Sequence, residues 1–501
     1  MTENQRIFSQ STSSTVTLYW DKPESAGANE EYEVFLDGKP AQTVQRTHCT
    51  LDQLAPDTEI CAEVYMKNRE IIGSCSVRTE KIPRRINVID WGAVGDGETM
   101  NTAVIQGAID ACCAGDEIYL PKGIYCTGAL RLHSDMAFYL EEGAVLQGTE
   151  NPEDYLPRIP SRFEGTELKC YSSLLNLGEL DHTSDPNCRN VKIYGKGVIS
   201  SGGQVLANRI IDLERERLGD YLSVNADLVA TCENERTIPG RVRPRLINLS
   251  NCQNVRISGL TLQNGASWNL HMIYSDSIVT DHCTFISEGV WNGDGWDPDS
   301  STNCTLFASR FYTADDSVAI KSGKNPEGNL INRPSKHIRI FDCCSAFGHG
   351  ICMGSEISGG IEDVRIWDCD LVNSSYGVEI KGTKKRGGYV RNVQVRDCVL
   401  PRLMIHSVSY NDDGEAASQP PVFEHCRFER LVLTGRGLDG PNDWSDVAPL
   451  ELIGFDTPGH ELYDIVLKDC TICGNAIALP VQNCRKLCLQ NICRKPTISL
   501  S

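Results

Sequence analysis

The stretch "NCQNVRISGLTLQN" (residues 251–264) introduces a pattern that the rest of the chain repeats. A polar residue and a cysteine precede a run of β-forming residues, and the pattern returns in "DHCTFIS" (281–287), "TNCTLFASRFYT" (302–313) and "WDCDLVNS" (367–374). The repeated cysteines are Cys252, Cys283, Cys304, Cys343, Cys369, Cys398, Cys426 and Cys470. Short strands that recur about once per solenoid coil, without helices between them, predict a parallel β-helix. Stacked coils would place these thiols in an internal ladder.

The residues before the repeat predict a separate small domain. From 14 to 79, apolar and polar residues alternate in short runs with turn signals between them, which is typical of an antiparallel β-sandwich. The segment resembles a fibronectin type III module at Trp20, Tyr32 and Val34, although Ile60 replaces the module's corner tyrosine. We therefore expect an all-β chain made of a sandwich, a linker and a β-helix, at residues 1–80, 81–85 and 86–501.

The net charge of the chain restricts the class of partner. Its 48 Lys and Arg residues against 67 Asp and Glu residues give a formal charge of -19. Such a balance argues against nucleic acid and against an anionic membrane as partners. An anionic substrate would require a local cluster of Lys and Arg, because exposed charges more than about 8–10 Å away are largely screened by salt.

Cysteine content and the first residues of the chain suggest a compartment. The 23 cysteines lie mostly in strand-like segments, so we expect buried free thiols in a reducing environment. Residues 1–15 lack the basic region and apolar core of a signal peptide, which predicts a cytoplasmic protein, or a secreted one if a leader was removed. The cysteine spacings do not match zinc ligand pairs, and we expect neither metal nor cofactor.

Two adjacent aspartates, Asp315 and Asp316, stand at the head of a strand-like run. If Val318 and Ile320 point into the core, Asp316 has core parity, and an unpaired carboxylate there would be costly. We therefore expect a bend or bulge at these two residues that turns both carboxylates outward. Asp294 lies 21 residues before Asp315, about one coil, which predicts that the two stack on neighbouring turns of one face.

Three carboxylates in one cleft predict acid–base chemistry. Their repulsion would raise at least one pKa and leave a protonated acid beside ionised bases, as glycoside hydrolysis requires. For any single aspartate, a place in a turn or at a calcium site is the alternative. The whole set argues against that alternative, because it is followed by His349 between two glycines and by a lysine-rich segment at 379–386.

Four ordered motifs resemble those of the polygalacturonase family of glycoside hydrolases. They are "NGD" (292–294), "ADD" (314–316), "GHG" (348–350) and "EIK" (379–381), and the earlier "GAVGDG" (92–97) resembles the N-terminal cap of pectin-degrading right-handed β-helices. The resemblance implies Asp315 as general acid, with Asp294 and Asp316 holding and deprotonating the attacking water. His349 would tune or orient the acid. The family inverts the anomeric centre, which implies carboxylates about 6.5–9.5 Å apart.

The substrate side of the resemblance departs from the family at one important position. Glu379 stands where the family has an arginine that pairs with a galacturonate carboxylate, and a carboxylate there would repel the substrate. Nearby cations at Lys321, Lys381, Lys385 and Arg386 would allow the uronate to shift, or the subsite receives a neutral or modified sugar. The expected substrate-binding set is Lys381, Lys321, Asp297, Arg162, Glu379, Asn292, His271 and Lys384.

Three insertions resemble those of the exo-acting branch of the family, in which added loops close one end of the cleft. They are the charged segment 203–245, then 325–337 and 354–360. A closed end would release one sugar, or a short unit, from the non-reducing end.

The sequence thus predicts an inverting glycoside hydrolase of α-1,4-galacturonosidic bonds in pectic oligosaccharides, without nucleic acid or membrane partners. It does not indicate an oligomeric state. One alternative within the class is a hydrolase of rhamnogalacturonan or substituted galacturonan, and one from another class is a β-helix that binds polysaccharide without turnover. A pectate lyase is less favoured, because elimination would need a calcium cluster and a basic arginine.

Overall fold

The structure, a computed structural model, describes most of the chain: residues 7–68, 70–410, 413–438, 443–474 and 479–496. Contacts divide the chain into two compact units, Met1–Arg85 and Ile86–Ser501, which are described separately below. Within the described ranges, no helix is both long and apolar enough to cross a membrane.

The first unit contains two antiparallel sheets around its own core. One sheet has the order β1-β2-β5, from strands Ile7–Ser11, Val16–Trp20 and His48–Leu51. The other has the order β4-β3-β6-β7, from strands Lys39–Val44, Tyr32–Leu36, Glu59–Met66 and Ile71–Arg78. Trp20 and Tyr32 meet edge to face in the core with ring centroids 5.5 Å apart, and Ile60 is buried beside them. The expected antiparallel sheets are confirmed, and the fibronectin type III resemblance stays a prediction.

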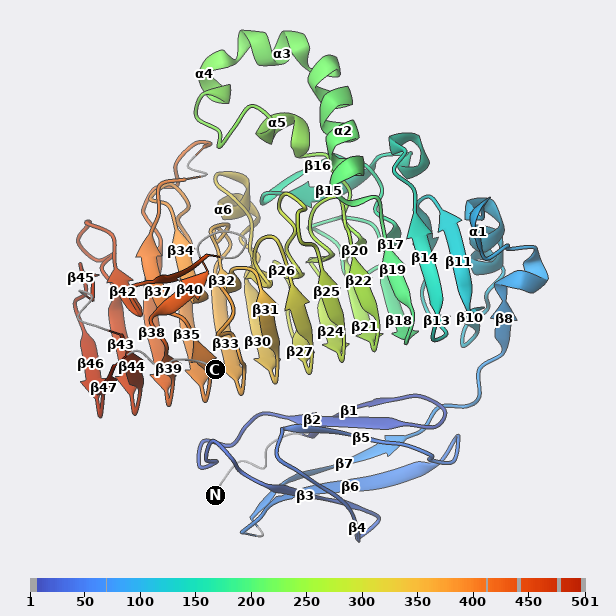
Figure 1. Cartoon of the computed structure of the whole chain (residues 1–501), viewed down its shortest axis with the longest axis horizontal. Helices are drawn as coiled ribbons and strands as arrows, with labels where there is room; N and C mark the ends of the chain where they lie inside the picture. The colour runs from blue at the N-terminus through green and yellow to red at the C-terminus, as the bar shows by residue number, and fades with distance from the viewer. Residues whose placement is uncertain (1–6, 69, 411–412, 439–442, 475–478, 497–501) are drawn as a thin grey trace. The chain divides into compact units, whose positions relative to one another are not determined.

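The second unit is the expected right-handed parallel β-helix, in which successive coils contribute strands to three long parallel sheets (Figure 1). The sheet that bears the site runs in the order β12-β17-β20-β23-β26-β29-β32-β34-β37-β42-β45. Its strands are Leu130–Leu132, Leu175–Leu177, Ile247–Ser250, Leu270–Ile273, Trp296–Asp299, Val318–Ile320, Gly350–Met353, Gly377–Gly382, Leu403–Ser407, Leu450–Ile453 and Val481–Gln482.

The other two long sheets complete the coils. The thirteen-stranded sheet contains β8 (Arg85–Asn87), β10 (Glu117–Leu120), β13 (Ala137–Leu140), β18 (Cys188–Gly195), β21 (Cys252–Ser258), β24 (Asp276–Asp281) and β27 (Thr305–Phe307). It continues with β30 (Ser335–Phe341), β33 (Ile361–Trp367), β35 (Tyr389–Arg396), β38 (Val422–Glu429), β43 (Tyr463–Lys468) and β46 (Leu487–Gln490). The eight-stranded sheet uses β9, β11, β14, β19, β22, β25, β28 and β31 (Asp96–Met100, Gly123–Thr127, Ala144–Gly148, Val198–Ser200, Thr261–Gln263, Thr284–Ile286, Arg310–Tyr312 and Cys344–Phe347). A four-stranded sheet of β36, β39, β44 and β47 (Val399–Leu400, Val432–Leu433, Thr471–Cys473 and Cys493–Lys495) covers the later coils.

The inner face of each coil forms one continuous apolar core, which includes all eight repeated cysteines. The expected single thiol ladder is corrected in detail, because the register separates the cysteines into more than one row. Five of them share the row just before the eight-stranded or four-stranded sheet: Cys283, Cys343, Cys369, Cys398 and Cys470. Cys252 instead pairs with Cys188, and Cys304 and Cys426 belong to the thirteen-stranded side. The thiols are buried as expected, since small apolar groups fit any inward position.

Helices and a hairpin are found outside the long parallel sheets of the solenoid. Helix α1 (Thr102–Asp110) buries Ile105, Ala108 and Ile109 at the N-terminal end. The expected charged insertion folds into four helices, seen in green in Figure 1: α2 (Gly203–Arg217), α3 (Gly219–Val224), α4 (Ala226–Val229) and α5 (Thr237–Gly240). The remaining elements are the hairpin β15–β16 (Ile159–Phe163 and Thr166–Cys170), helix α6 (Glu327–Ile331), the pair β40–β41 (Arg436–Leu438 and Trp444–Asp446), and the 3-10 turns η1 (Val88–Trp91) and η2 (Pro152–Tyr155).

Candidate active site

The predicted acid–base residues converge at the start of three neighbouring strands of the eleven-stranded sheet. Asp294 precedes β26, Asp315 and Asp316 precede β29, and His349 precedes β32. The chain bends at Ala314–Asp315 and resumes strand geometry at Val318, so the expected bend is confirmed. Because parallel strands place equivalent residues side by side, three short segments far apart in the chain present their side chains to one place.

The stacking of these carboxylates differs from the expected one by a single residue. Trp296 lies opposite Val318, and the Gly295 amide donates to the Asp316 carbonyl. Asp294 is therefore in register with Asp316 rather than with Asp315. The repeat across this coil is one residue longer than the spacing of Asp294 and Asp315, because the bend adds a residue outside the strand.

The glycines beside His349 have a steric reason. Gly348 and Gly350 adopt φ angles of 121° and 107°, a region that favours glycine. A Cβ at Gly348 would lie 2.3 Å from Thr313 Oγ1, and one at Gly350 would lie 2.3 Å from the Gly377 carbonyl oxygen. The "GHG" motif therefore lets the backbone pass close to its neighbours while the imidazole projects toward the carboxylates.

Direct contacts join the converging side chains. His349 Nδ1 lies 3.1 Å from Asp315 Oδ1 and 3.4 Å from Asp316 Oδ1. Lys321 Nζ lies 3.1 Å from Asp294 Oδ2. Of the three carboxylates, Asp315 is the accessible one, because its side chain is 28% exposed against 3% for Asp294 and 6% for Asp316.

The pKa values of the carboxylates are driven apart. Burial raises the pKa of Asp294 well above its usual range, and the charges of Asp315 and Asp316 raise it further against the opposing effect of Lys321. Burial would also raise the pKa of Asp315, but the charge and hydrogen bond of His349 outweigh it and lower that pKa. A raised pKa is thus found at Asp294, with burial rather than repulsion as its largest cause, whereas the pKa of the expected acid, Asp315, is lowered.

Protonation of His349 follows from the same contacts. Burial alone would lower the pKa of the imidazole, but the charges and hydrogen bonds of Asp315 and Asp316 raise it well above its usual value. The surroundings therefore favour the charged forms of His349 and Asp315 and the neutral form of Asp294.

These residues line a cleft of about 550 Å³, within the range of roughly 300–1,000 Å³ found for small-ligand sites. Its floor comes from the eleven-stranded sheet, and Glu164 of the β15–β16 turn and Glu233 of the helical insertion reach it from outside. The full lining is Glu164, Glu233, Trp268, Trp291, Asn292, Asp294, Asp315, Asp316, Lys321, His349, Gly354, Ser355, Glu356, Tyr376, Glu379, Lys381, Arg402, Met404, His406, Tyr410 and Glu451.

Several predicted substrate-binding residues line this cleft, among them Asn292, Lys321, Glu379 and Lys381. Asn292 Oδ1 accepts a hydrogen bond of 2.7 Å from Arg243, which holds the loop before β26. Lys321 also lies 4.3 Å from the Trp268 ring centroid, so its ammonium is fixed between an aromatic face and Asp294.

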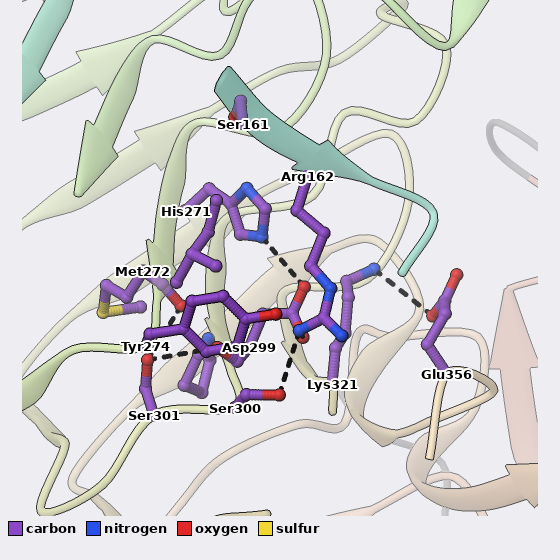
Figure 2. A network of polar contacts seen from close by, with 12 residues as sticks. Ser161, Arg162, His271, Met272, Tyr274, Asp299, Ser300, Ser301, Lys321 and Glu356 are labelled. Atoms are coloured by element: carbon purple, nitrogen blue, oxygen red, sulfur yellow. Dashed lines mark hydrogen bonds and ion pairs between the residues drawn. The ribbon is translucent and has the colours of Figure 1, made fainter. Parts of the chain in front are cut away.

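Arg162 and His271 were expected to contact substrate, and the structure corrects both. Each is fully buried and neither lines the cleft. Figure 2 shows the reason: Arg162 Nη1 lies 2.9 Å from Asp299 Oδ1, and His271 Nε2 lies 3.3 Å from Asp299 Oδ2. Burial lowers the pKa of His271 to about 4, so it is neutral. Both residues belong to a buried network around Asp299 that joins the hairpin to the sheet.

Asp297 and Lys384 are also corrected. Asp297 is fully buried behind the lining, and among the described residues neither of its carboxylate oxygens has a hydrogen-bond partner. Lys384 is exposed outside the cleft, while the neighbouring Arg386 is buried and bonded to Ser355 and Asn325. Of the cations expected after Glu379, Lys381 lines the cleft, and Lys384 and Arg386 do not.

Sequence reasoning missed the side chains supplied by the coils after Glu379. Arg402 and His406 line the cleft from β37 and the residue before it, and Glu451 lines it from β42. The available signal was strand parity: Leu403 and Ile405 are apolar and fully buried, so Arg402 and His406 must face outward.

In the described part of the chain, two groups of side chains have the geometry to hold a metal ion. They are Asp315, Asp316 and His349, and then Asp316, Cys352 and Glu379, with ligand atoms in each group within 4.8 Å of one another. The first group is already joined by its own ion pairs. The absence of a metal requirement stays a prediction.

Comparisons with known proteins agree with this geometry. Residues 178–409 match the family described as "Glycosyl hydrolases family 28", and residues 85–139 match "Rhamnogalacturonase A/epimerase, pectate lyase-like". The chain is 26% identical over 471 residues to the "Exo-poly-alpha-D-galacturonosidase" of Dickeya chrysanthemi, covering 83% of this chain and 77% of that relative. It is 32% identical over 332 residues to the "Probable polygalacturonase" of Vitis vinifera, covering 63% and 61%.

Solved structures show the same fold. The family 28 exopolygalacturonase of Yersinia enterocolitica superposes with a TM-score of 0.81 at 22% identity, over 97% of this chain and 96% of that one. The hyperthermoactive exopolygalacturonase of Thermotoga maritima superposes with a TM-score of 0.68 at 26% identity, over 84% and 94%. The fold therefore extends to the solved relatives over most of their length.

Proposed function

Because this chain belongs to glycosyl hydrolases family 28, we propose that it cleaves galacturonan oligosaccharides by inverting hydrolysis, one end unit at a time. The observation that carries the proposal is the convergence of Asp294, Asp315, Asp316 and His349 from neighbouring coils on one cleft, with Asp315 as the accessible carboxylate. Their surroundings raise the pKa of Asp294 and of His349 and lower that of Asp315. Environments that push neighbouring pKa values apart are typical of acid–base pairs.

In the proposed reaction, Asp315 is the acid. Its side chain is the accessible carboxylate, and it delivers a proton to the glycosidic oxygen as the bond between that oxygen and the anomeric carbon breaks. His349, 3.1 Å away, supplies this proton to Asp315 from its own Nδ1. The pair lets an ionised carboxylate act as an acid when the leaving oxygen develops negative charge.

The attacking water is assigned to the other two carboxylates. Asp294 first releases its own proton to solvent in the cleft, and its carboxylate then takes a proton from the attacking water. Its raised pKa makes this carboxylate a good proton acceptor. Asp316 lies in register with Asp294 on the next coil, so both can hold one water between them. The water forms the new bond to the anomeric carbon on the face opposite the leaving oxygen, which inverts that centre.

Action at the chain end is supported by what surrounds the cleft. Glu164 of the hairpin and Glu233 of the helical insertion both line it, so these two additions narrow the cleft beside the catalytic carboxylates. Relatives with the names exo-poly-alpha-D-galacturonosidase and exopolygalacturonase share the chain's fold over most of their length. We therefore propose release of a single galacturonate from the non-reducing end.

We also propose that the protein works in a reducing compartment. All 23 cysteines lie among the described residues and each is a free thiol. Ten of them belong to the core of the solenoid, where a thiol packs as a small apolar group.

The test is product analysis with one inactivating variant. The parent protein should release reducing sugar from trigalacturonate, with monogalacturonate as the first product and an inverted anomer by proton NMR. Asp315→Asn should lower kcat by about 100- to 10,000-fold, the range for loss of a general acid. Asp52→Asn, at an exposed position of the first unit, is the matched control.

Two results would contradict the proposal. Binding of trigalacturonate by the parent without turnover would indicate the polysaccharide-binding alternative. Hydrolysis of rhamnogalacturonan at a higher kcat/KM than galacturonan would indicate the alternative that the carboxylate of Glu379 favours.

A further inference from the structure

At the C-terminal end of the cleft, Glu379 occupies the position where the resemblance places a carboxylate-binding arginine. Glu379 Oε2 lies 2.9 Å from Lys381 Nζ, and its Oε1 lies 2.8 Å from His406 Nε2. Burial would raise the pKa of Glu379, but these two partners lower it to about 2, so it is ionised at neutral pH. Lys381 and His406 are therefore already committed to an acid of the protein itself.

His406 is held from both sides. Its Nδ1 lies 2.6 Å from Glu451 Oε1, on the coil after its own. Glu379, His406 and Glu451 thus form an acid–imidazole–acid row across three consecutive coils. Burial would lower the pKa of His406, but both carboxylates raise it, so the row carries one positive and two negative charges. A substrate carboxylate would therefore gain little electrostatic attraction from this row.

Arg402 is differently placed. It directly precedes β37, and its inward neighbour Leu403 is fully buried, so the arginine faces the cleft and lines it. Its one ion pair is to Glu451, with Nη2 3.4 Å from Oε2, and its buried Nε has no hydrogen-bond partner in the described part of the chain. Arg402 is also the one arginine among the described residues that line the cleft.

The position of Arg402 relative to the acid suits a neighbouring sugar. Its guanidinium lies 5.9 Å from the Tyr376 ring centroid, and that ring lies 4.8 Å from the ring of His349. A single aromatic ring therefore separates Arg402 from the histidine that contacts Asp315. A sugar next to the cleaved bond, lying along Tyr376, would bring its substituents to the guanidinium.

We propose that Arg402 binds the carboxylate of the galacturonate next to the cleaved bond, taking the role of the missing arginine from one coil farther along. The proposal rests on the proposed function and makes it more specific. Arginine suits this role because its planar fork donates two parallel hydrogen bonds to a carboxylate. Glu379 then orders Lys381 and His406 and does not face the substrate anion directly.

The test separates charge recognition from general damage to the cleft. Arg402→Gln removes the charge and keeps a polar but shorter side chain, and Glu451 keeps His406 as a partner. We expect KM for trigalacturonate to rise roughly 10- to 100-fold, the equivalent of one lost charged hydrogen-bond pair, with a smaller change in kcat. Arg402→Lys should recover part of the loss.

Two controls define the effect. The methyl ester of the same trisaccharide has no carboxylate, so Arg402→Gln should change its KM by less than about twofold. Arg131→Gln, an exposed arginine that pairs with Glu179, should leave KM unchanged for both substrates. Calorimetric binding of trigalacturonate to the parent and to Arg402→Gln measures the same contact independently of turnover.

The results distinguish failure of the Arg402 proposal from failure of the proposed hydrolysis. Equal affinity of the parent and Arg402→Gln for trigalacturonate would overturn the proposal, as would equal losses on the acid and on the ester. If the parent binds trigalacturonate through Arg402 without hydrolysing it, the proposed hydrolysis fails and the binding role of Arg402 stands. A loss in calorimetry confined to the acid substrate would support the assignment in either case.

Discussion

At the scale of single residues, Asp297 is a buried carboxylate that lowers the stability of the fold. It lies in β26 on the face opposite the core residue Trp296, is fully buried, and its carboxylate lacks a hydrogen-bond partner among the described residues. Burial raises its pKa well above the usual value, and Asp294 raises it further. A group that must either lose its charge or carry it unpaired destabilises the fold at neutral pH.

Replacing this carboxylate by its neutral isostere should therefore stabilise the protein in a pH-dependent way. A raised folded-state pKa means that folding is unpenalised below the unfolded value near 3.8 and increasingly penalised as pH rises above it. We expect Asp297→Asn to melt at a higher temperature than the parent at pH 7 and at the same temperature at pH 3.5. Calorimetric melts at both values test this, and a lower melting temperature for the variant at pH 7 would contradict it.

At the scale of elements, one carboxylate ties together the loops around the cleft. Asp413 Oδ2 lies 2.8 Å from Arg241 Nη2, just after α5, and Asp413 also pairs with Lys324, just before α6. Arg241 Nε lies 2.9 Å from Glu164 Oε2, which lines the cleft. The helical insertion, the hairpin turn and two later loops thus share one network of charges. Such networks hold loops in a single arrangement when each charge has its partner.

Removing the shared charge should loosen this arrangement without touching the catalytic carboxylates. Asp413→Asn leaves Arg241 and Lys324 without their common anion, so we expect KM for trigalacturonate to rise about 3- to 10-fold and disaccharide to appear among the first products. Chromatography of early products measures the change. Asp212→Asn, on the exposed side of α2, is the matched control, and an unaltered product profile in Asp413→Asn would exclude the network from end recognition.

The sequence predicts the catalytic part of this site better than its binding part, for a physical reason. Asp294, Asp315, Asp316 and His349 sit in short motifs whose glycines and bends are local, so their convergence follows from one coil length. Arg162 is different, because its burial depends on Asp299, which is 137 residues away in the chain. Contacts between distant segments such as these leave no local signal.

Arg402 and His406 line the cleft but were not predicted from the sequence. They fall in "PRLMIHS" (401–407), a stretch that belongs to no motif, and their role depends on which coil lies next to Glu379. Strand parity gives the outward direction of both side chains. The register that pairs Lys381 with His406 fixes their place, and it depends on the turn lengths of both coils.

At the scale of the whole molecule, the sequence of each coil carries the same signal for the fold. Each coil repeats β-forming residues and a small inward group, so an error in one coil leaves the period of the others unchanged. This redundancy explains why the β-helix follows from the sequence while the division of thiols into rows does not. A row depends on the exact residue count of each turn, and insertions change that count from coil to coil.

The charge of the molecule is the remaining whole-chain property that bears on catalysis. A formal charge of -19 repels a polyanionic substrate at long range, whereas Arg402 attracts it only inside the cleft. Salt shortens the reach of the exposed charges from about 30 Å at 0.01 M to about 8 Å at 0.15 M, and it screens partly buried pairs much less. Moderate salt should therefore remove the repulsion and keep most of the local attraction.

We therefore expect KM for pentagalacturonate to fall about 2- to 5-fold as sodium chloride rises from 0.01 M to 0.15 M, with kcat nearly constant. Initial rates at a series of salt concentrations measure this, and the methyl-esterified pentasaccharide is the control, because a neutral ligand feels no long-range repulsion. A KM that rises steadily with salt would mean that exposed cations, rather than buried ones, capture the substrate. That outcome would conflict with the placement of Lys384 outside the cleft and of Arg386 in the core.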